Sequence, residues 1–316
     1  MSDCTVAVIG GGPWGLALAS AAARTGSKTW LFSRKEHKIG LPTGVSPAED
    51  YRQVADVARL VLLAVPSQTV SEVAFALGDF LDGRHLVVHA IRGLAKDSMS
   101  PISDVIRQQS PVRRIGAIGG PLVADDLAAG RPSFMVVGSA YPEVRRAMTQ
   151  AFVTPALRIY ETDDLRGLEW ASALVGCLMI GVGYAKAAGV GAGLVAALIS
   201  RGVQEAGRIA AAAGGDERTL LGLAGYGDLL ASVEQPGRPE IMLGAALAAG
   251  KSLEQATREV PLRIEALSLI PRVAEWAAAH KVNAPIFHAL THGVLAAQSA
   301  AEVAHQLMTS PVEGFV

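Results

Sequence analysis

The sequence predicts an α/β chain in two parts, with a doubly wound parallel sheet in the first half and an all-α domain in the second. The first half alternates unbroken apolar runs with amphipathic segments, which is typical of parallel strands covered on both faces by helices. A glycine-rich turn opens the chain, and after Tyr160 the strand-like runs stop. We therefore expect one domain over residues 1–164 and a second over residues 165–316.

The glycine-rich turn follows the first apolar run directly. Residues 5–15 read TVAVIGGGPWG, and the glycines fit the pattern G-x-G-x-x-G. In this pattern Gly10 permits the tight turn, Gly12 lets a pyrophosphate approach the backbone, and Gly15 lets the next helix pack close to the strand. The N–H groups at the helix start then face the anion. We expect a dinucleotide cofactor to bind at Gly10, Gly12, Pro13, Trp14 and Gly15.

The context of the motif favours binding over a merely structural glycine turn. A helix-like run at Leu16–Thr25 leads to a second strand at Thr29–Phe32, which completes the βαβ unit of a Rossmann-type domain. The remaining strands of this domain are expected at Leu60–Val65, Leu86–Ala90, Ile115–Ile118, Phe134–Val137 and Leu157–Tyr160, and two of its helices at Thr69–Leu77 and Tyr141–Phe152.

The second half is rich in alanine and has helical periodicity. Its first helix, Trp170–Ala185, carries no charge, yet glycines interrupt it and Glu169 and Lys186 bound it, so a buried helix is favoured over a membrane span. Further helices are expected at Leu194–Ala213, Ile241–Ala249, Leu269–His280 and Ala301–Met308.

The overall composition excludes some partners and indicates a compartment. The net charge is −1 with no basic run, which argues against nucleic acid because nothing would neutralise a row of phosphates. Cys4 and Cys177 are far apart in apolar stretches, so buried thiols in a reducing cytoplasm are expected. No secretory leader is apparent. The expected partner is a small anionic substrate, and the sequence leaves open whether the chain forms a homodimer.

The end of the second strand bears on the choice of nicotinamide cofactor. An NAD site usually has a carboxylate there, whereas this strand ends Phe32-Ser33-Arg34-Lys35. A hydroxyl and two cations suit a ribose 2′-phosphate, so Ser33 and Arg34 favour NADP(H), with NAD(H) as the alternative. Arg34 stacked on the adenine is the other interpretation. Val65 and Pro66, after the third clear strand, are expected along the cofactor.

Several segments in one order resemble the bacterial NAD(P)-dependent glycerol-3-phosphate dehydrogenase family. GGGPWG, LLAVPSQ, HAIRGL, IGGPLVADDLAAGRPS, GLAGYGDLLAS and GKSLEQA match its motifs over nearly the whole length. The resemblance implies a dinucleotide domain, a helical substrate domain and reduction of dihydroxyacetone phosphate by NAD(P)H. It also implies that Ala124 and Glu265 contact the cofactor and that Asp228, Ser232 and Arg238 belong to the site.

The chain departs from the family at functional positions. The family's helical domain begins G-x-E-x-x-x-A-L-K-N, and its lysine donates the proton to the carbonyl. Here Val175 and Gly176 replace the lysine and the asparagine, and Arg92 replaces the lysine of W-A-T-K-G. Leu122 replaces a small polar residue, and Pro239 follows Arg238 where the family has an asparagine.

These departures bear on the chemistry. A positioned general acid is worth about 10²–10⁴ in rate, and valine cannot supply a proton. Arg92 is a poor acid, but it can clamp a phosphate or carboxylate. With Asp228, Ser232 and Arg238 it is our catalytic-site prediction.

Three hypotheses remain. The chain is a reductase with an altered anionic carbonyl substrate, a catalytically weakened protein that senses NADP(H) or a metabolite, or a reductase in which His89 supplies the acid.

Other candidates carry less weight. Lys186 lies eleven residues past Val175, about 16 Å along a helix, too far to replace the lysine. His288 and His292 share a helical face but lack a third ligand, so no metal site is expected. Asp125 and Asp126 are interpreted as a solvated first helical turn.

Overall fold

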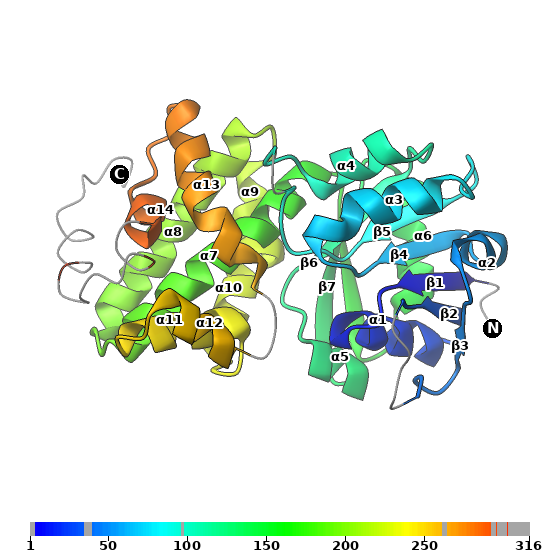
Figure 1. Ribbon diagram of the computed structural model, residues 1–316, viewed down its shortest axis with the longest axis horizontal. Helices are drawn as coiled ribbons and strands as arrows, with labels where there is room; N and C mark the ends of the chain where they lie inside the picture. The colour runs from blue at the N-terminus through cyan, green and yellow to red at the C-terminus, as the bar shows by residue number, and fades with distance from the viewer. Residues whose placement is uncertain are drawn as a thin grey trace. The chain divides into compact units, whose positions relative to one another are not determined.

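The structure, a computed structural model, describes residues 4–34, 40–95, 98–260, 264–291, 295 and 302 (Figure 1). It forms two compact units, Met1–Glu169 and Trp170–Val316. The helix that connects them begins at Leu165, so the division between the units falls inside this helix.

The first unit is built on one eight-stranded sheet with the order β3-β2-β1-β4-β5-β6-β7-β8. Every neighbouring pair is parallel except β6 and β7. The strands are β1 (Thr5–Ile9), β2 (Lys28–Phe32), β3 (Val45–Pro47), β4 (Leu60–Leu63), β5 (Leu86–His89), β6 (Ile115–Gly119), β7 (Ser133–Gly138) and β8 (Leu157–Thr162).

Helices cover both faces of this sheet, as the alternating pattern predicts (Figure 1). One core packs α1, α5 and α6 against the sheet, and a second core packs α2, α3 and α4 against the other face. The predicted doubly wound α/β fold is therefore confirmed. The helices are α1 (Pro13–Arg24), α2 (Tyr51–Val57), α3 (Val70–Gly78), α4 (Ile102–Gln109), α5 (Ala124–Ala129) and α6 (Pro142–Phe152), with a 3₁₀ turn at Ser67–Thr69.

The sheet differs from the prediction in two ways. The three-residue strand β3 was not expected, because it is short and ends in Pro47. The expectation that all strands are parallel is wrong for β6 and β7, which are antiparallel. An apolar run does not encode strand direction, so the sequence pattern missed this reversal.

The second unit is helical in its described part (Figure 1). It contains most of α7 (Leu165–Ala187), then α8 (Ala192–Ala212), α9 (Glu217–Leu221), a π-helical turn (Leu223–Gly227), α10 (Asp228–Val233), α11 (Pro239–Ala248), α12 (Leu253–Glu259), α13 (Glu265–Ala279) and α14 (Pro285–Ala289). The helix expected at Ala301–Met308 lies outside the described residues apart from position 302.

Helix α7 forms the core of this unit. It is long and apolar enough to cross a membrane, but 94% of its most apolar window is buried inside the protein. Its glycines allow close helix packing: a Cβ at Gly183 would lie 2.4 Å from the carbonyl oxygen of Ile241 on α11, and one at Gly244 would lie 2.1 Å from that of Ile180. The interruptions of the apolar run therefore mark where two backbones approach each other.

The two cysteines are free thiols. Cys177 is fully buried in α7, as expected, and burial raises the pKa of its thiol. Cys4 is only half-buried, so the expectation of two buried thiols is wrong for this residue, which precedes β1 at the end of the sheet.

Candidate functional site

Two glycines of the β1–α1 turn occupy positions that no side chain can share. Gly10 leaves β1 with a φ of 124°, and a Cβ there would lie 2.2 Å from the carbonyl oxygen of Ala64. A Cβ at Gly15 would lie 1.8 Å from the carbonyl oxygen of Gly10. A Cβ at Gly12 would meet no described heavy atom within 4 Å. The turn thus combines two closely packed glycines with one that is open to an approaching group, which fits a pyrophosphate.

Helix α1 begins directly at this open glycine. Gly12 is its exposed N-cap and Pro13 is its first residue. The first N–H groups of a helix have no partner within the helix, and the dipole makes this end positive. The half-buried Trp14 donates its indole N–H to the carbonyl oxygen of Ala90, 2.9 Å away. This bond ties the glycine turn to the loop that follows β5.

The loops after β1, β4 and β5 meet at the carboxyl edge of the sheet. The amide of Ala64 donates to Ile9, and that of Ala90 donates to Leu63, each at 2.8 Å. Val65 is half-buried and Pro66 is exposed just after β4. Ala124 is half-buried at the start of α5 and packs against the core on the α1 side.

A separate group of side chains lies at the end of β2. Ser33 is half-buried and Arg34 is exposed. One guanidinium nitrogen of Arg34 lies 3.5 Å from Oε1 of Glu72, in the first turn of α3. The rings of Phe32 and Tyr51 pack with centroids 4.7 Å apart. Lys35 and Glu36, which entered the cofactor prediction, lie outside the described residues.

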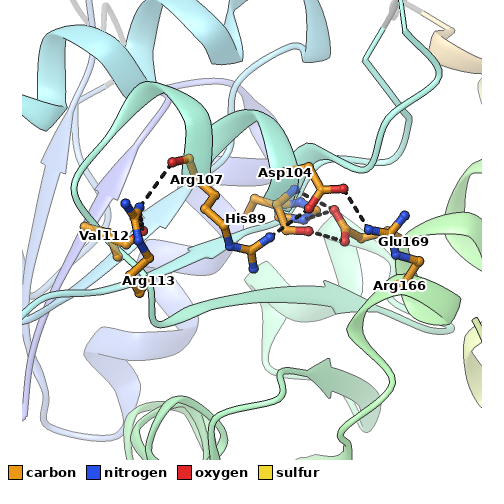
Figure 2. Close-up of polar contacts among 8 residues, drawn as sticks. His89, Asp104, Arg107, Val112, Arg113, Arg166 and Glu169 are labelled. Atoms are coloured by element: carbon orange, nitrogen blue, oxygen red, sulfur yellow. Dashed lines mark hydrogen bonds and ion pairs between the residues drawn. The ribbon is translucent and has the colours of Figure 1, made fainter. Parts of the chain in front are cut away.

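A buried polar cluster joins β5, α4 and the first turn of α7 (Figure 2). Nε2 of His89 lies 2.9 Å from Oε1 of Glu169. The backbone amide of Ser103 donates to Oε1 at 2.7 Å, and its hydroxyl donates to Oε2 at 2.6 Å. Nδ1 of His89 is buried and has no hydrogen-bond partner among the described residues. Glu169 makes three hydrogen bonds, one of them with Nε2 of His89, and this arrangement fixes the orientation of the imidazole ring.

Ion pairs also hold the charged side chains next to this cluster in place (Figure 2). Asp104 accepts from Arg107 at 2.7 Å and from Arg166 at 2.9 Å. In the same turn of α7, Leu168 fills the space over two sheet glycines, because a Cβ at Gly119 or at Gly138 would lie 2.6 Å from its methyl carbons. The first turn of α7 is therefore fixed to the sheet of the first unit by both polar and apolar contacts.

Sequence reasoning singled out His89 but missed Glu169 as its partner and Ser103 as a donor to Glu169. A buried glutamate at the edge of an uncharged helix was the available signal, because such a carboxylate requires donors. Arg92 is half-buried in the loop after β5, and Leu122 is 7% exposed before α5.

Three predicted residues of the helical unit lie together. Asp228 begins α10 and its side chain is fully buried. A guanidinium nitrogen of Arg238 lies 3.4 Å from Oδ1 of Asp228, and Nε of Arg238 donates to Gln235 at 3.2 Å. The hydroxyl of Ser232 donates to the backbone carbonyl of Asp228 at 2.6 Å. Ser232 thus shapes α10, while Arg238 is positioned by two acceptors. Glu265 is half-buried at the start of α13.

Two models of known protein families match this chain, one in its first half and one in its second half. Residues 37–145 match the model of the NAD-dependent glycerol-3-phosphate dehydrogenase N-terminus, and residues 164–305 match that of its C-terminus. The chain belongs to this family. It is 33% identical to the glycerol-3-phosphate dehydrogenase [NAD(P)+] of Gluconobacter oxydans, over 97% of each chain. It is 27% identical to the enzyme of the same name from Fusobacterium nucleatum, over 96% of each chain.

Solved structures of the family have the same fold. The glycerol-3-phosphate dehydrogenase of Coxiella burnetii superposes with a TM-score of 0.88 and 25% identity, covering 97% of this chain and 99% of that one. The predicted resemblance to the glycerol-3-phosphate dehydrogenase family is therefore confirmed.

Within this family fold, the position of Val175 is apolar and closed. Val175 is fully buried in α7 and Gly176 is buried beside it. Lys186, near the end of α7, is exposed and donates to the carbonyl oxygen of Val233 at 2.8 Å. His288 is exposed on α14, and His292 lies outside the described residues. The described residues contain no group of three or more potential metal ligands.

A buried carboxylate that sequence reasoning missed stabilises another part of the helical unit. Glu205 on α8 accepts from the amides of Ile286 at 3.0 Å and Phe287 at 2.9 Å, in the first turn of α14. Burial raises the pKa of Glu205 to about 7, although these two amides and the nearby Arg208 and Arg201 act to lower it.

Proposed function

We propose that this chain is an NAD(P)-dependent dehydrogenase acting on a CH–OH group, which reduces a small phosphorylated or anionic carbonyl compound. The observation that carries the proposal is the glycine turn, in which Gly10 and Gly15 admit no side chain and Gly12 is open. The names of its relatives, glycerol-3-phosphate dehydrogenase [NAD(P)+], support glycerol 3-phosphate and dihydroxyacetone phosphate as the first substrates to test.

The cofactor would lie along the carboxyl edge of the first unit, residues 1–164 in our proposed division. Gly12 and the first turn of α1 would receive the pyrophosphate, with Val65, Pro66, Ala124 and Glu265 as further contacts. When bound, a reduced nicotinamide supplies the hydride. Arg34 supports a preference for NADP(H), since a guanidinium binds a 2′-phosphate bidentately. Replacing Arg34 with alanine should therefore weaken NADPH binding far more than NADH binding.

The helical substrate domain, residues 165–316, would hold the anionic substrate. The Arg238 guanidinium, oriented by Asp228 and Gln235, is suited to bind a phosphate or carboxylate, and Arg92 is suited to the same task. Asp228 and Ser232 would complete this site. Val175 carries no proton to transfer, which supports either an altered substrate or a slow reaction.

The buried Val175 also favours a second candidate function. A chain that binds the cofactor and an anionic metabolite, but lacks the lysine acid, would serve as a sensor that regulates a partner. We place the protein in the cytoplasm on the basis of its composition.

One assay separates these functions. Purified protein is mixed with NADH or NADPH, dihydroxyacetone phosphate is added, and the absorbance of the reduced nicotinamide is followed. Turnover at an ordinary rate supports the dehydrogenase and excludes the sensor. Binding of the cofactor without turnover on a panel of phosphorylated and carboxylated ketones supports the sensor. Binding of neither nucleotide at millimolar concentration rejects both.

A further inference from the structure

Three elements of the first unit bring their side chains together at the end of β2. Phe32 and Arg34 come from the strand and the residues after it, Tyr51 begins α2, and Glu72 lies in the first turn of α3. The Phe32 and Tyr51 rings are in contact, and Arg34 pairs with Glu72 at 3.5 Å. The charges of Arg34 and Glu72 both act on the pKa of Tyr51, which burial raises, so these groups form one cluster.

The ion pair in this cluster is easily exchanged for a ligand. The side chains of Arg34 and Glu72 are 60% and 71% exposed. An exposed pair at this distance contributes little to stability, because water solvates both partners. Breaking it to bind an anion therefore costs the protein little. Neither residue is needed to hold the fold, so their charges can serve recognition.

The two charges favour opposite forms of the ribose. In many NAD sites a carboxylate at the end of the second strand accepts a hydrogen bond from the 2′-hydroxyl, whereas arginine accommodates a 2′-phosphate. In this chain Arg34, just after β2, supplies the arginine, and Glu72 on α3 supplies a carboxylate 3.5 Å from it. The pair thus presents one group suited to each cofactor.

We propose that Glu72 is the residue that limits NADP(H) and favours NAD(H) at this site, by competing with the 2′-phosphate for Arg34 and by accepting a hydrogen bond from the 2′-hydroxyl. This inference rests on the proposed dinucleotide function. A carboxylate within a few ångströms of a phosphate in solvent repels it weakly, so the effect is about threefold to tenfold in affinity.

The test compares Glu72→Gln with Asp79→Asn by isothermal titration of the full chain with NADH and with NADPH. Asp79 is the exposed C-cap of the same helix, about 10 Å further along its axis, and its replacement removes the same charge. We expect Glu72→Gln to bind NADPH about threefold to tenfold more tightly and NADH more weakly. We expect Asp79→Asn to change neither affinity by as much as twofold.

The opposite signs make the result specific. An unchanged ratio of the two affinities in Glu72→Gln, or an equal change in Asp79→Asn, overturns the proposal while leaving the dinucleotide function intact. If the wild-type chain binds neither nucleotide, the proposed function fails and the inference fails with it. Adenosine 2′,5′-bisphosphate and 5′-AMP differ only in the 2′-phosphate, and the same shift between these two ligands would locate the effect at the ribose.

Discussion

The glycine turn of the first unit and the start of the helical unit retain different amounts of the family pattern. In the turn, Gly10 and Gly15 stand where any side chain would strike backbone atoms. In α7, Val175 and Gly176 stand where the family resemblance predicts lysine and asparagine. Cofactor geometry depends on backbone packing, which admits no larger residue. Proton chemistry depends on one side chain, which a well-packed valine can replace without disturbing the fold.

The largest effect should come from filling the glycine turn. Gly10→Ala places a methyl group against the carbonyl of Ala64 at a φ of 124°. Overpacking and backbone strain together should lower the free energy of unfolding by about 3–5 kcal/mol, measured by urea denaturation.

The matched control for this change is Gly12→Ala, whose methyl group meets no described atom. It should change the stability by less than about 1 kcal/mol, yet weaken NADPH binding, because it occupies the path of the pyrophosphate. If both substitutions destabilised the protein equally, the prediction that Gly10 serves packing and Gly12 serves binding would be wrong.

The free energy of unfolding should depend on pH through Glu205, a buried carboxylate of the helical unit. The pKa of Glu205 is raised from its ordinary value of 4.5 to about 7, so the folded state holds this proton more tightly than the unfolded state. The resulting stabilisation is complete below pH 4.5 and is lost as the pH rises through 7, and it amounts to about 3 kcal/mol.

Glu205→Gln removes this titration. The difference in unfolding free energy between the wild type and the variant should therefore fall across pH 4.5–7, as measured by urea denaturation at several pH values. Parallel curves for the two proteins would show that Glu205 titrates normally.

Restoring a lysine tests the difference in α7 directly. If the loss of the acid limits turnover, Val175→Lys should raise the rate with dihydroxyacetone phosphate by about 100-fold, or about 2.7 kcal/mol in the barrier. Val175→Met is similarly long but uncharged, and it should leave the rate unchanged. A rise in both variants would point to pocket shape rather than to proton transfer.

The smallest effect should come from the buried cluster in Figure 2. Ser103→Ala removes the hydroxyl bond to Glu169 but keeps the backbone amide bond. We expect a loss of about 1–3 kcal/mol in unfolding free energy, because Glu169 loses one of three donors. The exposed Ser98 provides the control, and Ser98→Ala should change stability by less than about 0.5 kcal/mol.

Sequence patterns predicted what local chemistry determines. The apolar runs located seven of the strands, and the glycine spacing located the turn, because both signals depend on neighbouring residues. The patterns did not give the antiparallel pairing of β6 and β7, because an apolar run does not encode strand direction. They also missed β3, whose three residues are too few for a period.

The sequence patterns also did not predict contacts between residues that lie far apart along the chain. His89 and Glu169 are 80 positions apart, and Glu205 caps a helix 81 positions away. No spacing rule connects such pairs, so their roles became visible only in three dimensions. The family resemblance singled out Asp228, in the matched segment GLAGYGDLLAS, and Arg238, at the position of the family's Arg-Asn pair, and the structure brings the two together.

The outermost strands of the sheet also have a consequence for the behaviour of the protein in concentrated solution. At one border, β3 ends in Pro47, which lacks an N–H to offer a further strand. At the other border, β8 carries the exposed Arg158 and Glu161. A neighbouring molecule that extended the sheet would meet a missing donor at one border and exposed charges at the other. These borders should therefore resist intermolecular aggregation through β-sheet extension.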